Sequence, residues 1–144
     1  MTIDAGGNAV IAYNDDSAAP GGQQQISVQK VSPAGVKLWG STGVTLTSGS
    51  GTRNNPRVAV LTNGDVAIGW TESGWQLRRL TSAGAPTGTP MSMTETGHTI
   101  FLCDLQPGDN GSVIASWTRS FGTNYATTSR WVFAQKFSSA NAPL

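Results

Sequence analysis

The chain has 144 residues, which is enough for one domain with a buried core. Charged residues make up 12 % of it and the formal net charge is +1, so the sequence lacks the charged field that attracts nucleic acid or an anionic membrane. We therefore expect no nucleic-acid partner and no membrane partner.

Short strands separated by turns run along the whole sequence. The chain contains 18 glycines and 7 prolines, and no window keeps apolar residues at i, i+3, i+4 and i+7 over three helical turns. Short runs of β-branched and aromatic residues alternate instead with clusters of Gly, Asn, Ser and Pro, which is typical of strands and turns. The sequence therefore predicts an all-β protein.

The predicted strands fall into three repeats of a single domain, residues 1–144, at approximately 1–50, 51–98 and 99–144. In the first repeat we expect strands at residues 1–4, 8–13, 26–31 and 36–39, the last resuming at 44–46, with a long polar loop at 14–25 and a turn at 32–35. The second has strands at 56–61, 65–70, 75–80 and 91–93, with turns at 63–64 and 81–84. The third has strands at 100–105, 112–117 and 131–137, with turns at 106–111 and 138–141 and a long loop at 118–130. The first repeat lacks most of its first strand, and the third lacks its last.

The repeats agree position by position. Residues 63–70 (Asn-Gly-Asp-Val-Ala-Ile-Gly-Trp) have counterparts at residues 7–13 and 111–117, each a tight turn followed by an apolar strand that ends on an aromatic residue. The aligned triplets are Tyr13, Trp70 and Trp117; Ile11, Ile68 and Ala115; Val10, Ala67 and Ile114; Lys30, Arg79 and Lys136; and Val31, Leu80 and Phe137. The turns that follow read Ser-Pro-Ala-Gly, Thr-Ser-Ala-Gly and Ser-Ser-Ala-Asn, and Gly or Asn at the fourth position predicts a positive φ there.

A four-stranded unit that recurs about every 50 residues is typical of the blades of a β-propeller. The second strand of each repeat avoids charge on both faces, and one face carries small residues. Such a strand suits a sheet that neighbouring sheets cover on both sides. A β-sandwich is the competing interpretation, but it does not explain a regular repeat.

The repeats resemble a known family. The pattern Asn-Gly-Asp-Val-x-Ile-x-Trp, followed by x-Val-Gln-Lys-Val-Ser-x-x-Gly-x-x-Leu-Trp, is similar to β-propeller repeats of secreted bacterial proteins. Residues 32–39 also resemble the Asp-box turn of sialidase-like propellers, although the turn aspartate is missing and the spacing is one residue shorter. The resemblance covers nearly the whole chain and implies a fold. Because propellers serve as hydrolases, lectins and scaffolds alike, it implies no particular function.

Three repeats are fewer than the roughly 4–8 blades of closed propellers. Two interpretations follow. Either the sequence is an excerpt of a longer chain that supplies the missing blades, or two copies join head to tail in a six-bladed homodimeric ring. The predicted fold is therefore three four-stranded antiparallel repeats that form a partial propeller or half of a six-bladed dimeric ring.

Few residues offer catalytic or metal-binding chemistry. His98 is the only histidine and no Ser lies in a Gly-x-Ser-x-Gly motif, so we expect His98 to be a surface loop residue rather than a member of a triad. Cys103 is the only cysteine and lies in an apolar run, which predicts a buried side chain. Asp15 and Glu72 follow matching aromatic residues and are the best carboxylate pair for a glycosidase, although the third repeat has Arg119 there. No segment has the spacing of a calcium loop or of a phosphate-binding glycine motif, so we expect no metal and no cofactor.

Ligand binding through the long loops is the more specific prediction, because loops on a rigid scaffold commonly carry function. In the loop at residues 118–130, aromatic rings lie beside amide and guanidinium donors, a combination that suits stacking on a sugar ring and hydrogen bonds to its hydroxyls. The candidate ligand-binding residues are Asp15, Glu72, Arg119, Phe121, Asn124, Tyr125 and Arg130. The alternative role of Phe121 and Tyr125 is to cap the core beneath the loop. The five tryptophans lie at strand positions and are expected to pack.

The sequence thus predicts a non-enzymatic binding or structural β-propeller module with a carbohydrate as candidate ligand. With so few charged residues, we expect the solvated surface to consist mainly of Ser, Thr, Asn, Gln and Gly, a composition that suits β-rich modules outside the cell, so we expect an extracellular or cell-surface protein. The first residues carry no signal peptide, and a secretion signal would have been removed or would lie upstream. The alternative function is a fragment of a glycosidase-like propeller enzyme whose catalytic residues lie mostly outside this segment.

Overall fold

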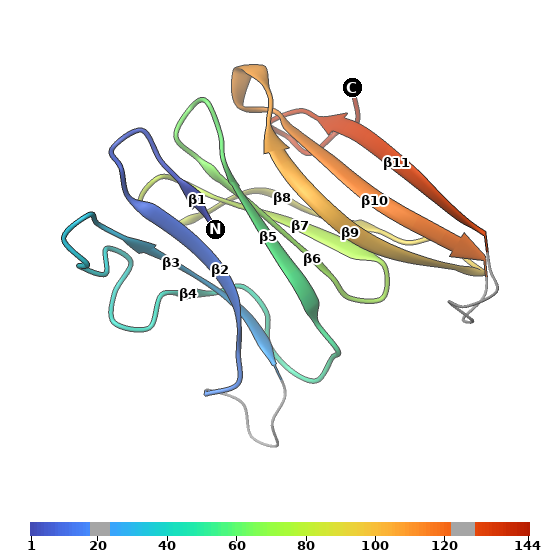
Figure 1. Cartoon of the computed structure of the whole chain (residues 1–144), viewed down its shortest axis with the longest axis horizontal. Coiled ribbons are helices and arrows are strands. Elements are labelled where there is room, and N and C mark those ends of the chain that lie inside the picture. Colours follow the sequence, from blue (N-terminus) through green and yellow to red (C-terminus); the bar gives the residue numbers. More distant parts are fainter. Residues whose placement is uncertain (18–23, 122–128) are drawn as a thin grey trace.

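The computed structural model describes residues 1–17, 24–121 and 129–144 (Figure 1). The strands are β1 (Thr2–Ile3), β2 (Ala9–Asp15), β3 (Gln25–Val31), β4 (Val44–Thr45), β5 (Asn54–Val60), β6 (Val66–Thr71), β7 (Trp75–Leu80), β8 (Pro86–Met93), β9 (His98–Pro107), β10 (Val113–Phe121) and β11 (Arg130–Phe137), with a short 3-10 turn η1 (Asp109–Gly111). The described part of the chain is therefore all-β, as predicted. It contains no helix long and apolar enough to cross a membrane.

The described strands form three antiparallel sheets, which lie side by side in Figure 1. Sheet 1 has the order β1-β2-β3-β4, sheet 2 the order β5-β6-β7-β8, and sheet 3 the order β9-β10-β11. Within each sheet, neighbours in space are also neighbours along the chain. Sheets 1 and 2 have the four strands expected, and sheet 3 has, among the described residues, the three strands expected for the third repeat. After β11, the segment that follows the turn makes an isolated bridge between Phe137 and Pro143.

Several strands extend further than predicted, among them β8, which begins at Pro86, and β9, which spans His98–Pro107. β2 continues to Asp15 and β10 continues to Phe121, so these residues belong to strands rather than to the loops expected there. Both extensions are paired, because Asp15 lies opposite Gln25 and Phe121 lies opposite His98. Ladder pairing therefore continues past the aromatic residue at which the prediction ended each strand.

The strand expected at residues 36–39 is reduced to a bridge between Val31 and Lys37. The side chain of Gln29 binds the backbone that would have continued the strand. Its Oε1 accepts a hydrogen bond from Trp39 N (3.1 Å), and its Nε2 donates one to Gly40 O (2.9 Å). Backbone pairing thus ends with Leu38, whose N–H donates to Lys30 O (2.7 Å), and the fourth strand of sheet 1 forms later, as β4.

Hydrophobic side chains fill the spaces between neighbouring sheets. The cluster between sheets 1 and 2 contains Val10, Ile26, Val28, Trp39, Val58, Val66, Ile68, Trp70 and Leu80. The cluster between sheets 2 and 3 contains Ala59, Leu61, Ala67, Trp75, Leu77, Ile100, Leu102, Leu105, Val113, Ala115, Trp117 and Phe137. Sheet 2 is therefore covered on both faces, and every residue of β6 is buried. The absence of charged side chains from both faces of this strand had predicted that neighbouring sheets cover it on both sides.

Trp39, Trp70, Trp75 and Trp117 pack in these clusters, as expected, and none is more than 8 % exposed. The prediction was wrong for Trp131, which is 45 % exposed. It lies near the start of β11, the edge strand of sheet 3, opposite Arg119 of β10. An edge strand has a neighbour on one side, so a large side chain there keeps more contact with solvent.

The predicted burial of Cys103 was also wrong, since this cysteine is exposed. The register between β9 and β10 shifts at this point, so that Leu102 lies opposite Trp117 and Asp104 lies opposite Ser116. This β-bulge leaves Cys103 without a partner residue and breaks the two-residue alternation of the strand. It also lets both Leu102 and Leu105, three positions apart, point into the core.

The turn after the third strand has one geometry in each sheet. Its fourth residue donates its backbone N–H to the carbonyl of the first, from Gly35 to Ser32 (2.8 Å), Gly84 to Thr81 (2.9 Å) and Asn141 to Ser138 (2.9 Å). The φ angles of Gly35, Gly84 and Asn141 are 81°, 87° and 62°, which confirms the predicted positive φ at this position.

The aligned basic residues connect neighbouring sheets through these turns. Lys30 Nζ in sheet 1 donates to Ser82 O in the turn of sheet 2 (3.4 Å). Arg79 in sheet 2 reaches sheet 3, where its Nη2 donates to Ser138 O (2.8 Å) and its Nε donates to the side-chain Oδ1 of Asn141 (2.6 Å). Its Nη1 donates to the carbonyl of Gly111 (2.8 Å) in the turn before β10. Lys30 and Arg79 thus each bind the turn of the next sheet along the chain.

Candidate ligand-binding site

An aromatic surface extends along one face of sheet 3 beyond its contact with sheet 2. The register pairs Trp117 with Phe133 and Arg119 with Trp131, while Phe121 lies opposite His98 of β9. Alternate residues of a strand point to the same face, so these side chains share one face of the sheet. We call the set His98, Trp117, Arg119, Phe121, Trp131 and Phe133 the aromatic shelf. Exposure along the shelf rises from 8 % at Trp117 to 45 % at Trp131 and 64 % at Phe121.

Arg119 is the central charged group of the shelf. Its Nη1 donates to both carboxylate oxygens of Glu95, at 2.9 and 3.0 Å. Its Cζ lies 4.8 Å from the centre of the Phe133 ring and 5.6 Å from that of Trp131, which places the guanidinium over two aromatic faces. Among the described residues none accepts a hydrogen bond from its buried Nε. The guanidinium is therefore fixed in place and retains a donor without a partner in that part of the chain.

A small cavity opens beside this guanidinium. Its volume is about 160 Å³, and its lining residues are Met93, Thr94, Glu95, Ile100, Trp117, Arg119 and Phe133. The walls are apolar and aromatic, and the ion pair between Arg119 and Glu95 lies at their edge. Ligand pockets for drug-sized molecules are larger, about 300–1,000 Å³. The cavity therefore suits one ring of a ligand whose remainder would extend over the exposed part of the shelf.

His98 belongs to this site, although the sequence predicted a surface loop residue. It is the first residue of β9 and is half-buried. Its ring meets Phe121 edge to face, with 5.4 Å between centroids, and its Nδ1 lies 3.3 Å from Glu95 Oε1. The histidine thus contacts two other residues of the site, Phe121 through its ring and Glu95 through Nδ1.

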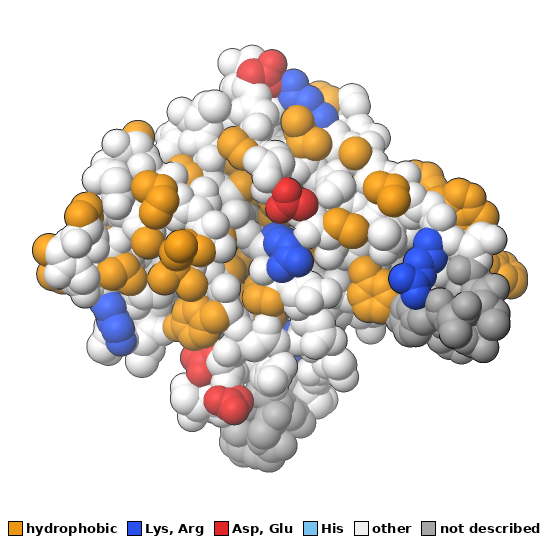
Figure 2. Space-filling view, in the orientation of Figure 1, with side chains coloured by type: hydrophobic (Ala, Val, Ile, Leu, Met, Phe, Trp, Pro, Cys, Tyr) orange, Lys and Arg blue, Asp and Glu red, His pale blue; other side chains and the backbone are white. Residues whose placement is uncertain are grey.

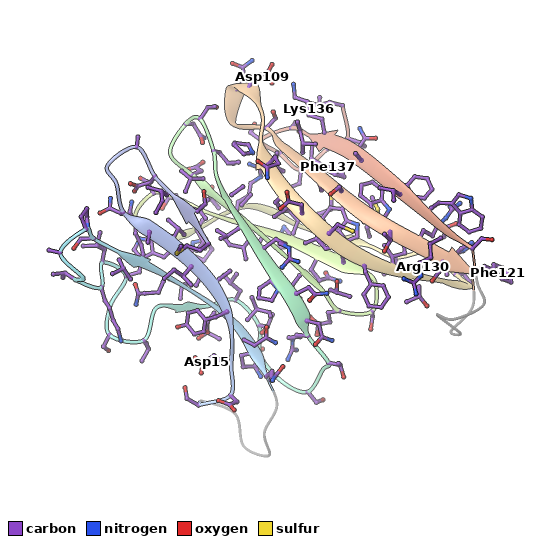
Figure 3. All side chains as sticks on the ribbon, in the orientation of Figure 1. Asp15, Asp109, Phe121, Arg130, Lys136 and Phe137 are labelled. Atoms are coloured by element: carbon purple, nitrogen blue, oxygen red, sulfur yellow. The ribbon has the colours of Figure 1, made fainter. Side chains whose placement is uncertain are left out.

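The structure separates the residues predicted to bind a ligand (Figure 3). Arg119 and Phe121 lie together on the shelf, at the end of sheet 3 opposite to Asp109. Arg130 begins β11 and lies opposite Ser120, so strand alternation places it on the other face of the sheet. Asn124 and Tyr125 lie outside the described residues.

Asp15 and Glu72 lie away from the shelf, and each has its own partners. Asp15 accepts hydrogen bonds from Ser17 N (3.0 Å) and Ser17 Oγ (2.6 Å), and these bonds hold the pKa of its carboxyl below the usual value. Glu72 accepts a hydrogen bond from Trp70 Nε1 (2.9 Å) and lies 2.9 Å from Arg53 Nε. A glycosidase general acid needs a raised pKa. The hydrogen bonds from Ser17 instead lower the pKa of Asp15.

Sequence reasoning missed Glu95, His98, Trp131 and Phe133 as parts of the site. Alternation along residues 131–133 could have placed Trp131 and Phe133 on one face once that strand was known to pair with β10. The position of Glu95 depends on the path of the connection between β8 and β9, for which the sequence offers no signal. In the part of the chain that the structure describes, no group of three or more His, Cys, Asp or Glu side chains comes together to hold a metal ion.

Comparison with known proteins assigns no identity to this site. No model of a protein family matches the chain, and no curated protein matches it in sequence. The functional argument therefore depends on the residues of the shelf and on the arrangement of the sheets.

Proposed function

We propose that the chain is a non-enzymatic binding module of β-propeller type, part of an extracellular or cell-surface protein, and that its aromatic shelf binds a carbohydrate. The observation that carries the proposal is the exposed pair Trp131 and Phe121 on either side of the ion pair between Arg119 and Glu95. A sugar ring offers an apolar face of C–H groups and a rim of hydroxyls. Aromatic rings cover such a face, while guanidinium donors and carboxylate acceptors match hydroxyls, which both donate and accept hydrogen bonds.

The propeller interpretation is supported by the stacking of the described sheets. Each is antiparallel with its strands in chain order, and sheet 2 is packed between the other two. Equivalent cations, Lys30 and Arg79, connect one sheet to the turn of the next. Blades of a propeller pack in this way around their ring.

A glycan array followed by calorimetric titration tests the binding proposal. We expect saturable binding of at least one glycan to the native chain. Trp131→Ala and Arg119→Met should each weaken it by at least about 10-fold, equivalent to about 1.4 kcal/mol. Val132→Ala is the matched control, because Val132 is an exposed neighbour on the opposite face of β11 and should leave the affinity unchanged.

Two results would contradict the proposal. One is the absence of binding to any glycan of the array, which would favour a purely structural module. The other is glycan binding that survives both shelf variants. In that case the ligand would sit elsewhere, and the rim near Asp15 and Glu72 would be the next surface to test.

A further inference from the structure

The outer face of sheet 3 repeats the surfaces by which sheets 1 and 2 dock on their neighbours. The register pairs Val10 with Lys30 in sheet 1, Ala67 with Arg79 in sheet 2 and Ile114 with Lys136 in sheet 3. In the first two sheets, the apolar member of the pair is fully buried against the next sheet. In sheet 3, Ile114 is 39 % exposed, and Val132, further along the same face, is 76 % exposed.

The ion pair on this face also has a buried counterpart. Lys30 pairs with Asp4 of the preceding turn, and the two side chains are 14 % and 12 % exposed beneath sheet 2. Lys136 pairs with Asp109 of its own preceding turn, and these side chains are 37 % and 69 % exposed. Figure 3 shows Asp109 and Lys136 side by side at one end of sheet 3. The same arrangement is thus covered in sheet 1 and open in sheet 3.

The complementary surface lies on the outer face of sheet 1. Ile11 and Val31 are the counterparts of Ile68 and Leu80, which are fully buried where sheet 1 packs on sheet 2. On sheet 1 these positions are only partly covered, and the neighbouring Ile3 is 56 % exposed. Figure 2 shows hydrophobic side chains at the surface on the side of the molecule that sheet 1 forms.

The turn at residues 32–35 of sheet 1 is also uncovered, like the outer face of that sheet. In sheet 2, a Cβ on Gly84 would lie 2.9 Å from ring atoms of Trp39, because sheet 1 packs against that turn. In sheet 3, the corresponding Asn141 is buried and bound by Arg79. In sheet 1, a Cβ on Gly35 would meet nothing within 4 Å. The turns of sheets 2 and 3 are therefore occupied by the preceding sheet, and the turn of sheet 1 is not.

We propose that the outer face of sheet 3 docks on the outer face of sheet 1 in a second copy of this chain, with Lys136 Nζ donating to carbonyls of the turn at residues 32–35. This contact continues the two interfaces within the chain, with the same cation position and the same apolar positions. Each copy carries both complementary faces, so the association is head to tail. Two copies bring together six sheets of the kind described, which falls within the range of about 4–8 blades for closed propellers. The proposal depends on the blade-like stacking above and is independent of glycan binding at the shelf.

Sedimentation equilibrium of the native chain, with single variants and an equimolar mixture of two variants, tests the contact. Val132→Asp places a charge on the outer face of sheet 3, and Ile3→Asp places one on the outer face of sheet 1. Both positions are exposed, so both variants should fold, which circular dichroism checks. We expect the native chain to associate and each variant to weaken association by at least 10-fold. The mixture should recover association, because the intact face of each variant matches the intact face of the other. Arg78→Glu, at an exposed position of sheet 2, is the control and should leave the native mass unchanged.

A second variant tests the proposed role of the cation. Lys136→Gln keeps most of the side chain but removes the charge, and it should also weaken association by at least 10-fold. A native chain that stays monomeric at high concentration would overturn the proposal. So would a dimer that Val132→Asp disrupts and Ile3→Asp does not, since that result indicates sheet 3 packed on sheet 3. Glycan titration of a monomeric native chain separates the two proposals, because the shelf would bind without the second copy.

Discussion

Arg79 should be the polar residue on which the packing of sheet 2 against sheet 3 depends most. It is 3 % exposed, and its guanidinium donates to Asn141 Oδ1, Gly111 O and Ser138 O at 2.6, 2.8 and 2.8 Å. Burial lowers the pKa of Arg79, which reflects the cost of removing its charge from water. A hydrogen bond to a charged group contributes about 1.5–3 kcal/mol net, but these contributions do not add fully, because removing the charge also removes its desolvation cost.

We therefore expect Arg79→Met to lower the free energy of unfolding by about 3–5 kcal/mol, within a typical total of about 5–15 kcal/mol. Methionine keeps the apolar stem, so the loss reports the three hydrogen bonds. The assay is urea denaturation followed by tryptophan fluorescence. Arg78→Met, at the exposed neighbouring position, is the control and should change stability by no more than about 0.5 kcal/mol. A loss below about 1 kcal/mol for Arg79→Met, or equal losses for both variants, would refute the reasoning.

Three further predictions concern single residues. Gly84 and Gly35 both have positive φ, so replacing either with alanine should lower the free energy of unfolding by about 1–2 kcal/mol. At Gly84, the contact of the new Cβ with Trp39 should add about 1–3 kcal/mol to that loss. Equal losses for the two variants in urea denaturation would argue against the packing of Trp39 on this turn. Exposed Cys103 should react fully with a thiol reagent in the native protein, and reaction only after denaturation would contradict the bulge at this position. Hydrogen bonds from a lysine side chain and from an asparagine hold the pKa of Asp4 well below its usual range. The ionised Asp4 therefore stabilises the fold fully above its unfolded-state pKa of about 3.9, and this stabilisation is lost as the pH falls below that value. Asp4→Asn should accordingly make the urea denaturation midpoint depend less on pH in the acid range. An unchanged pH dependence would contradict this assignment.

Much of the fold could be predicted because strands leave a local signal. The tight turn before Trp70 and the charge-free strand that ends there were visible in the sequence, and the structure confirms the strand and its burial on both faces. The alignment of Lys30 with Arg79 was visible too. That each cation reaches the turn of the next sheet was not, because the contact joins residues far apart in the chain.

The errors arise where pairing overrides the local pattern. The run around Cys103 reads as buried, but a bulge opposite Trp117 displaces one residue of it. The side chain of Gln29 takes the place of backbone pairing at Trp39 and Gly40, which no alternation pattern reveals. Of the candidate ligand-binding residues, Arg119 and Phe121 lie together on the shelf, as their spacing in one strand allows. Glu95, which pairs with Arg119, is brought there by the sheet arrangement alone.

The shelf itself can be tested most directly by NMR, through the indole N–H signals of the five tryptophans during titration with a bound glycan. The proposal predicts that the signals of Trp131 and Trp117 shift with saturation, because these rings lie on the shelf and beside its cavity. The signal of Trp70, which is buried and donates its indole N–H to Glu72, should stay in place. Shifts confined to Trp70 or Trp39 would contradict the shelf as the binding site and would move it to the rim of sheets 1 and 2.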